Sequence, residues 1–385
     1  MILGVAKEPL AGEKRVAQTP ETVRQLVGLG YQVQLEKGAG VAAGYPDAEY
    51  QEAGAKLVAS LDLGKVDVFA HVRPLSPATV KKLKKGAISV GLASPASEGK
   101  TVQALQAHNV TAFALELVPR ISRAQSMDAL TSQALVAGYR CVLEAAMRLP
   151  RFFPLYMTAA GTVPPASVLV LGAGVAGLQA IATAKRLGAK VQAYDVRSAS
   201  ADEVRSMGGT FIELDLDAHA DGQGGYAKEL SEDRQKRQQE LLTPYVTQAD
   251  VIITTAAIPG RPAPRLITAQ MLKDMKPGSV IIDLAAETGG NVEGSVAGKD
   301  TEISVQKGLG TITLVGMKDV ASTMAFDASR LFAKNIANLV ALMTVDGALV
   351  PDFDDEVVAG SCLTHAGDIR HEPTREALSS TKKGK

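Results

Sequence analysis

Residues 167–197 read SVLVLGAGVAGLQAIATAKRLGAKVQAYDVR. An apolar run rich in valine and leucine ends in a GxGxxG pattern, and an alanine-rich segment with helical spacing follows it. A second apolar run then ends at Asp195, where dinucleotide-binding folds place an acidic residue. This order of strand, glycine turn, helix and strand predicts a βαβ unit that binds a dinucleotide.

The three glycines of this pattern each have a separate physical task. We expect Gly172 to form the tight turn, Gly174 to let a pyrophosphate approach the backbone, and Gly177 to let the helix pack on the strand. Val175 and Ala176 open the helix, whose free N–H groups and positive dipole end would face the phosphates. The pattern therefore predicts where the pyrophosphate binds.

Asp195 is expected to select the cofactor. Its carboxylate would accept hydrogen bonds from both hydroxyls of the adenosine ribose, and its charge would repel a 2′-phosphate. Arg197 favours the opposite choice, since a nearby arginine is how NADP enzymes accept that phosphate. Because Asp195 holds the position at the strand end, we expect NAD(H) rather than NADP(H).

The alternation of strands and helices extends over the whole chain. Short apolar runs separated by helical segments imply βαβ units and parallel sheets. Long helical patterns cover residues 128–148 and 323–343, and a shorter helix is expected to begin at Pro20 after Thr19 and to end at Gly30. The expected strands lie at residues 2–6, 31–36, 66–72, 87–93, 110–117, 167–172, 190–195, 210–215, 250–255, 279–284 and 311–316.

We therefore expect an α/β fold with two doubly wound Rossmann-like domains separated by a cleft. The first would contain residues 1–133 and 322–385, because the C-terminal helix is expected to return to it. The second, residues 134–321, would be the NAD(H)-binding Rossmann domain, and a segment rich in turn residues, RFFPLYMTAAGTVPPA, lies within it. A length of 385 residues fits two domains.

Composition and charge exclude several classes of protein. The formal net charge is zero, so no basic field would attract nucleic acid or anionic lipid. The start, MILGVAKEP, meets charge and proline too early for a signal peptide, and no apolar run approaches the roughly 20 residues that span a bilayer. Two distant cysteines and five scattered histidines offer no metal-ligand spacing. We expect a cytoplasmic protein without a metal, without nucleic acid and without direct membrane insertion.

A polar junction interrupts this apolar chain. Residues 119–133 read PRISRAQSMDALTSQ, with two arginines, two glutamines, an aspartate and several hydroxyl groups. A solvated loop would explain such a stretch, and so would the wall of a polar binding site. Composition by itself leaves both explanations open.

Several motifs, in the same order along the chain, resemble a known family. The chain is similar to the NAD(H)-binding domain of proton-translocating NAD(P) transhydrogenase in the motifs RISRAQSMD, TAAGTVPPA, GAGVAGLQAIATAKRLGA, GGYAKE, KPGSVIIDLA and FAKNIANL. The resemblance implies that NADH binds at the cleft and passes hydride directly to NADP⁺ held on a separate domain. A membrane domain would couple this transfer to proton movement.

The same resemblance implies partners. A chain that ends at residue 385 without membrane helices is similar to the split form of the family, in which this domain is a peripheral subunit. Its partners would be a domain or subunit that binds NADP(H), together with the membrane subunits. We expect a homodimer on the cytoplasmic face of the inner membrane.

The polar junction matches the loop that surrounds the nicotinamide in the family. The resemblance implies that Gln125 binds the nicotinamide ribose, and that Arg120 and Asp128 hold each other and orient the carboxamide. No side chain needs to act as an acid or base, because hydride moves without a proton. Catalysis would rest on placing two cofactors in contact and on excluding water. The further cofactor contacts that we expect are Ile121, Ser122, Thr131, Ser132, Val196, Arg197, Gly225, Tyr226, Gln238 and Ala257.

A glycine-rich segment, GQGGYAKELSED at residues 222–233, matches a mobile loop of the family that closes over the site. Its glycines allow movement, and Tyr226 is an aromatic side chain that would fold over bound NADH. Without the family, a glycine-rich surface turn explains the same residues.

Alanine dehydrogenase, a relative that shares the opening KE…RVAxTP, is the strongest alternative. Its amino-acid substrate needs an arginine, a titrating lysine and a histidine. Arg15 matches the arginine, but Val72 or Arg73 stands at the lysine position. The histidine position falls on Gly91, and His71 nearby is most simply structural. A nucleotide-sensing regulatory subunit is a second alternative, since it also needs no acid or base.

Overall fold

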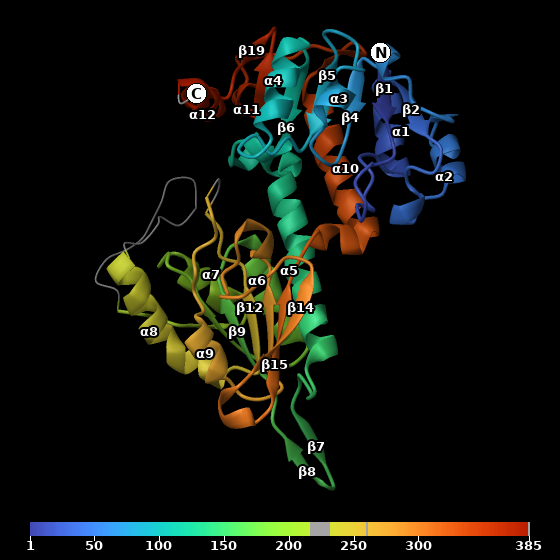
Figure 1. Cartoon of the computed structure of the whole chain (residues 1–385). Helices are drawn as coiled ribbons and strands as arrows, with labels where there is room; N and C mark the ends of the chain where they lie inside the picture. Colours follow the sequence, from blue (N-terminus) through green and yellow to red (C-terminus); the bar gives the residue numbers. More distant parts are fainter. Residues whose placement is uncertain (216–231, 259–260, 384–385) are drawn as a thin grey trace. The chain divides into compact units, whose positions relative to one another are not determined.

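The computed structural model describes residues 1–215, 232–258 and 261–383 (Figure 1). The chain forms two compact units. Unit 1 contains Met1–Gln133 and Ala321–Lys385, and unit 2 contains Ala134–Val320. Each unit is built on a mostly parallel sheet, as expected for two Rossmann-like folds.

The large sheet of unit 1 is formed by β1 (Ile2–Val5), β2 (Gln32–Glu36), β3 (Lys56–Val58), β4 (Val68–Ala70), β5 (Ile88–Gly91), β6 (Thr111–Ala114), β18 (Cys362–His365) and β19 (Asp368–Ile369). Its strand order is β19-β18-β6-β5-β4-β1-β2-β3. The strands from β6 to β3 pair in parallel, and β18 pairs antiparallel with β6. The order reverses at β1, which is the doubly wound topology that the sequence predicted.

The helices of unit 1 are α1 (Pro20–Gly28), α2 (Asp47–Glu52), α3 (Pro77–Val80), α4 (Gly99–Ala107), the start of α5 (Ala129–Arg148), α10 (Ala325–Leu342), α11 (Glu356–Ser361) and α12 (Glu372–Lys383). The shorter elements are the 3₁₀ turns η1 (Val41–Ala43), η2 (Leu63–Lys65), η3 (Leu115–Leu117), η4 (Ser122–Met127) and η8 (Val320–Met324), and the hairpin of β16 (Thr344–Val345) and β17 (Ala348–Leu349). Helix α1 confirms its predicted signals: Thr19 is the N-cap, and Gly30 follows the last turn with a φ of +92°.

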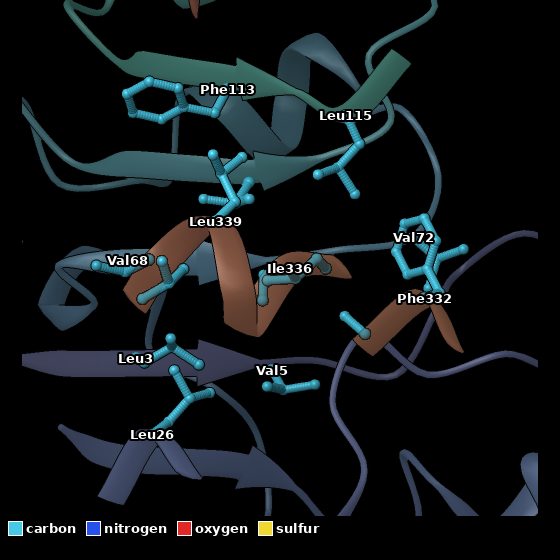
Figure 2. Packing of buried hydrophobic residues seen from close by; sticks show 14 of the residues in the cluster. Leu3, Val5, Leu26, Val68, Val72, Phe113, Leu115, Phe332, Ile336 and Leu339 are labelled. Carbon is cyan, nitrogen blue, oxygen red and sulfur yellow. The ribbon is translucent and has the colours of Figure 1, made fainter. Parts of the chain in front are cut away.

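Helix α10 closes one core of unit 1 (Figure 2). Phe332, Ile336 and Leu339 lie at helical spacing on one face of α10, and all three are fully buried. They belong to the same apolar cluster as Leu3 of β1 and Val68 of β4. Burying a side chain of this size contributes about 1.5–3 kcal/mol. A helix from the C-terminal part of the chain is therefore integral to unit 1.

The sheet of unit 2 is formed by β9 (Ser167–Leu171), β10 (Lys190–Tyr194), β11 (Thr210–Phe211), β12 (Val251–Thr254), β13 (Val280–Asp283), β14 (Lys299–Ser304) and β15 (Thr311–Gly316). Its order is β11-β10-β9-β12-β13-β15-β14, parallel except for β14 at the edge. The helices are the rest of α5, then α6 (Val175–Arg186), α7 (Ser200–Ser206), α8 (Glu232–Gln248) and α9 (Ala269–Lys273), with the 3₁₀ turns η6 (Ala286–Thr288) and η7 (Gln306–Gly308). Among the described residues, no helix has both the length and the apolar character needed to cross a bilayer.

One expected strand was wrong in extent, and one hairpin was not predicted. The strand expected at 210–215 contains only Thr210 and Phe211, because β11 is the sheet edge and pairs with β10 over two residues. The turn-rich segment after α5 contains a hairpin of β7 (Tyr156–Thr158) and β8 (Gly161–Val163), which extends from one end of unit 2 (Figure 1). Its two strands are short and lie among turn residues, so the sequence pattern did not predict them.

Candidate nucleotide-binding site

The strand order of unit 2 identifies the end of the sheet where a ligand is expected. The order reverses at β9, whose neighbours are β10 and β12. In open parallel sheets, ligands bind outside the carboxyl ends of the strands at such a reversal. Gly172 follows β9 at this point, Asp195 follows β10, and Thr255 follows β12. The fingerprint thus lies where the topology predicts a ligand.

The glycine loop has the geometry that the sequence predicted. Gly172 has a φ of +100°, and a Cβ atom there would lie 2.8 Å from the Thr255 hydroxyl. A Cβ atom on Gly177 would lie 1.8 Å from the Gly172 carbonyl oxygen, so the first turn of α6 packs on the loop backbone. Gly174 is exposed, and nothing lies within 4 Å of its Cβ position. The open side of the loop is therefore at Gly174, where a pyrophosphate would approach.

The first turn of α6 is fixed from a second side. Gly174 is the N-cap of α6, which leaves the N–H groups of Val175 and Ala176 without partners inside the helix. Helix α5 approaches this turn through Gly138, where a Cβ atom would lie 2.1 Å from the Ala176 carbonyl oxygen. Sequence reasoning gave Gly138 no role beyond helical spacing. Its role is to let two helices approach within backbone contact and so hold the first turn of α6.

Each carboxylate oxygen of Asp195 already accepts two hydrogen bonds. Its Oδ1 accepts hydrogen bonds from the Arg197 backbone N–H and from Arg197 Nε, both at 2.9 Å. Its Oδ2 accepts from the Ala173 N–H at 2.7 Å and from Arg197 Nη2 at 3.1 Å. The carboxylate thus joins the end of β10 to the glycine loop. The Arg197 guanidinium donates a hydrogen bond to each of its two oxygens. Sequence reasoning treated Asp195 and Arg197 as opposing signals and missed that they pair.

The remaining expected cofactor contacts in the described part of unit 2 lie on α8 and after the ends of β10 and β12. Gln238 of α8 is 2% exposed, and its Nε2 donates a hydrogen bond of 2.9 Å to the Tyr194 hydroxyl. Burial raises the pKa of Tyr194 to about 12, although the bond from Gln238 acts in the opposite direction. Val196 is half-buried against the core, and Ala257 is exposed after β12. Gln238 therefore links α8 to the end of β10 through a buried hydrogen bond. Its contact with a cofactor stays a prediction.

The polar junction of unit 1 forms η4 and the start of α5. The Asp128 carboxylate accepts hydrogen bonds from the Thr131 N–H at 2.9 Å and from the Thr131 hydroxyl at 2.6 Å, which caps α5. Gln125 is exposed, and its side-chain amide makes no hydrogen bond within the described residues. Arg120 and Ser122 are also exposed. The pairing of Arg120 with Asp128 stays a prediction.

Helix α10 supports this junction from beneath. Asn335 and Asn338 both donate through Nδ2 to the Ser126 carbonyl oxygen, at 2.9 and 3.1 Å. The Ser132 hydroxyl donates to Asn335 Oδ1 at 2.7 Å, and Ile121 packs against the core of the unit. Sequence reasoning missed both asparagines. The available signal was two amides three residues apart in the otherwise apolar stretch FAKNIANLVAL.

Comparison with known proteins now adds to this geometry. The family model described as "Alanine dehydrogenase/PNT, N-terminal domain" matches residues 4–137, and "Alanine dehydrogenase/PNT, C-terminal domain" matches residues 141–372. The chain belongs to the alanine dehydrogenase/PNT family. The first match covers the N-terminal part of unit 1, and the second covers most of unit 2 and continues into the C-terminal part of unit 1.

Within the alanine dehydrogenase/PNT family, similar proteins are named as transhydrogenases. The chain is 49% identical over 383 residues to a Rhodospirillum rubrum protein named as the first portion of "NAD(P) transhydrogenase subunit alpha", over 96% of this chain and 98% of that protein. It is 43% identical over 370 residues to "NAD(P) transhydrogenase subunit alpha" of Haemophilus influenzae, over 96% of this chain and 71% of that protein. A crystal structure of transhydrogenase from Sinorhizobium meliloti matches with a TM-score of 0.86 at 44% identity, over 96% of this chain and all of that one. The resemblance found in the motifs is confirmed.

Unit 1 also contains Arg15, the arginine compared above with that of an amino-acid site. Arg15 donates through Nε and Nη2 to the two oxygens of Glu13, at 2.9 and 2.7 Å, and through Nη1 to Gln133 Oε1 at 2.8 Å. Gln133 in turn donates to the Ser132 hydroxyl at 3.2 Å. These bonds connect Arg15 to the start of α5 and give it a structural role.

Glu13 is the centre of this buried cluster. Its side chain is fully buried, and it also accepts a hydrogen bond of 2.6 Å from Arg73 Nε. Burial by itself raises the pKa of Glu13, but the hydrogen bonds and charge of Arg15, and then the charge of Arg73, outweigh it and hold the pKa at about 2. Glu13 therefore remains a carboxylate that neutralises two arginines.

The lysine and histidine positions of an amino-acid site are filled differently. Arg73 is bound to Glu13, and an arginine stays protonated in any case. A Cβ atom at Gly91 would lie 2.5 Å from Nδ1 of His71, so a side chain at position 91 has no room. Burial lowers the pKa of His71 to about 4, and its Nδ1 donates to the Arg73 carbonyl oxygen at 2.7 Å. His71 is a neutral structural side chain.

Gly225 and Tyr226 lie outside the described residues, as do residues 222–231 of the segment expected to close over the site. Their contribution stays a prediction.

Proposed function

We propose that this chain is the NAD(H)-binding subunit of a proton-translocating NAD(P) transhydrogenase. It would bind NADH and deliver hydride directly to NADP⁺ held on a separate NADP(H)-binding domain, with a membrane partner coupling the transfer to proton movement. The proposal rests mainly on the state of the segment Ser122–Met127, which forms η4 and is called the Gln125 loop below. Its backbone is held by Asn335 and Asn338 at the Ser126 carbonyl oxygen, while the Gln125 amide is exposed and makes no hydrogen bond in the described chain.

The glycine loop supports binding of the nucleotide. The open side at Gly174 and the N-terminal turn of α6 offer backbone N–H groups to a pyrophosphate. Asp195 at the end of β10 would accept the hydroxyls of the adenosine ribose and disfavour a 2′-phosphate. This arrangement favours NAD(H) on this chain and leaves NADP(H) to the partner.

The polar loop supports positioning rather than proton transfer. Gln125 would bind the nicotinamide ribose, and Arg120 and Asp128 would orient the carboxamide. Hydride transfer needs no acid or base, and the chain's contribution is to hold the ring in place and exclude water. A dehydrogenase acting on an amino acid would need a titrating lysine and a histidine, but Val72 or Arg73 stands at the lysine position and Gly91 at the histidine position.

The test is hydride transfer in a reconstituted mixture. The purified chain with NADH is added to a separate NADP-binding domain loaded with NADP⁺, and NADPH formation is measured. A second sample contains the chain alone with NADH, pyruvate and ammonium. Turnover in the mixture only would support the proposal, whereas turnover only with pyruvate would establish an amino-acid dehydrogenase. Binding of NADH with no turnover in either sample would leave a nucleotide-sensing subunit.

Replacing Gln125 by asparagine is expected to slow hydride transfer while NADH still binds. The shorter side chain keeps the amide but withdraws it from the nicotinamide ribose, so the ring loses its orientation. We expect a fall in rate of roughly tenfold or more and a change in the NADH dissociation constant of less than about threefold. Stopped-flow transfer and NADH titration measure the two. Gln51→Asn, on an exposed face of α2, is the matched control, and equal losses in rate and binding would contradict the assignment of Gln125.

We also propose that the chain forms a homodimer that attaches peripherally to membrane subunits on the cytoplasmic face of the inner membrane. The stretch from the end of α5 to β7 of the hairpin exposes several large apolar side chains: Met147, Phe152, Leu155, Tyr156 and Met157. Met157 is 77% exposed. Such a concentration of apolar side chains on a projecting hairpin is typical of a protein–protein contact.

Replacing Met157 by glutamate is expected to convert the dimer to a monomer. A charge placed in an apolar contact would lose its hydration without gaining a partner. Sedimentation velocity at micromolar concentration measures the change, and circular dichroism checks the fold. The control is Met207→Glu, at the end of α7, where the methionine is also exposed. A dimer that survives Met157→Glu, or a monomer in the wild type, would contradict this use of the hairpin.

A further inference from the structure

The carboxylate of Asp195 has no acceptor position left. Two carboxylate oxygens offer about four lone-pair positions. The backbone N–H groups of Ala173 and Arg197 fill one on each oxygen. The guanidinium of Arg197 fills the other two, through Nε and Nη2. The ion pair is mostly buried, with the Asp195 side chain 8% exposed and that of Arg197 20% exposed.

An adenosine ribose needs two of these positions. Its two hydroxyls would both donate to Asp195 in the binding mode that the fold predicts. The two backbone donors are fixed parts of the glycine loop and of the turn after β10, so they cannot leave without unfolding the loop. The guanidinium is at the end of a flexible side chain and occupies two positions, the same number that the hydroxyls require.

We infer that Arg197 is an internal competitor for the adenosine ribose. Its guanidinium occupies the ribose positions on Asp195 in the empty site and must release them when NAD(H) binds. This inference rests on the proposed NAD(H) binding at Asp195. Arg197 keeps a mostly buried carboxylate paired when no nucleotide is present, and the breaking of this pair lowers the affinity of the chain for NAD(H).

Arginine is an effective competitor because it forms two hydrogen bonds to the carboxylate at once. A planar guanidinium matches the two oxygens of a carboxylate, whereas a lysine ammonium carries the same charge but makes no such fork. Arg197→Lys therefore keeps the charge beside the nucleotide and weakens the competition, although it also removes the hydrogen bond of 3.3 Å from Arg197 Nη2 to the Ala173 carbonyl oxygen. Arg205 of α7 serves as the matched control, because it is also paired with carboxylates, but its bonds to Asp202 and Glu213 are exposed and do not involve Asp195.

The experiment is a titration of NADH into the full chain, followed by NADH fluorescence. The chain has no tryptophan, so protein emission interferes little. Arg197→Lys is expected to bind NADH roughly fivefold more tightly than the wild type, which corresponds to weakening one partly buried ion pair. Reduced nicotinamide mononucleotide, which lacks the adenosine ribose, should bind the two proteins equally. Arg205→Lys should bind NADH as the wild type does.

Other outcomes separate this inference from the proposed function. If wild type binds NADH and Arg197→Lys binds it equally or more weakly, Arg197 does not compete with the ribose and the inference is overturned alone. Tighter binding of reduced nicotinamide mononucleotide by Arg197→Lys would also overturn it, because the gain would not involve the adenosine ribose. If wild type binds no NADH, the proposed function and the inference both fail.

Discussion

Replacing Glu13 by glutamine is expected to lower the free energy of unfolding by about 3–5 kcal/mol. The carboxylate is fully buried between Arg15 and Arg73, and it accepts hydrogen bonds from both guanidinium groups. A neutral amide cannot neutralise them, and its NH₂ group would face donors where a carboxylate oxygen accepts. Two arginines would then be left in a buried place without their counter-charge. Urea unfolding at neutral pH, followed by circular dichroism, measures the loss.

The control for this prediction is another glutamate in an ion pair with an arginine of unit 1. Glu356 is 65% exposed and bonds Arg123 at 3.3 Å on the surface. Glu356→Gln should change the free energy of unfolding by less than about 0.5 kcal/mol, because exposed pairs are screened by solvent. If the two variants lose similar, small amounts, Glu13 is not the buried counter-charge that its contacts indicate.

Acid should remove the same contribution in the wild type. The pKa of Glu13 is lowered in the folded chain, from an ordinary value of 4.5 to about 2. Its stabilising contribution is therefore complete above about pH 4.5 and is lost as the pH falls towards 2. Glu13→Gln should lack this part of the pH dependence, and unfolding curves between pH 5 and about 2 would show the difference.

Replacing Gly177 by alanine is the second change expected to have a large effect. The added Cβ atom would lie 1.8 Å from the Gly172 carbonyl oxygen, a backbone atom that cannot turn aside. Either α6 or the glycine loop must move, and we expect a loss of about 3 kcal/mol in the stability of unit 2 together with loss of NADH binding. Alanine would otherwise favour a helix, so the sign of the effect is diagnostic of this contact. Urea unfolding and NADH titration measure the two losses.

Gly174→Ala is the matched control within the same loop. Nothing lies within 4 Å of its Cβ position, and its φ of −77° suits alanine. The fold should keep its stability, while the methyl group would obstruct the approach of a pyrophosphate and weaken NADH binding at least tenfold. Unchanged NADH binding in Gly174→Ala would mean that the phosphates do not approach the loop there. Wild-type stability in Gly177→Ala would contradict the packing role of that glycine.

Much of the fold could be predicted because its signals are local. The β9 run, the three glycines and the strand ending at Asp195 follow one another in a short stretch, and each has a steric or periodic reason that is independent of the rest of the chain. Strands at the sheet edge and outside the main sheets were harder to predict from the sequence. β11 has one neighbouring strand and pairs over two residues, and the hairpin of β7 and β8 lies within a turn-rich stretch.

The support of the site could not be predicted in this way. Asn335 lies more than 200 positions from Ser126, and Arg15 lies 118 positions from Gln133, yet hydrogen bonds join both pairs. A sequence pattern shows that such a residue is polar on an apolar helix or strand. It does not show which distant polar group it meets.

The sequence by itself determined the class of fold, the glycine turn, the place of Asp195 and the family, because backbone sterics and apolar periodicity act over a few residues. Only the tertiary structure decided that Arg197 holds Asp195, that α10 supports the Gln125 loop, and that Glu13 neutralises two arginines. These are choices among several possible partners of opposite charge or matching hydrogen-bond type. The choice depends on which groups folding brings within about 3 Å of each other and shields from water.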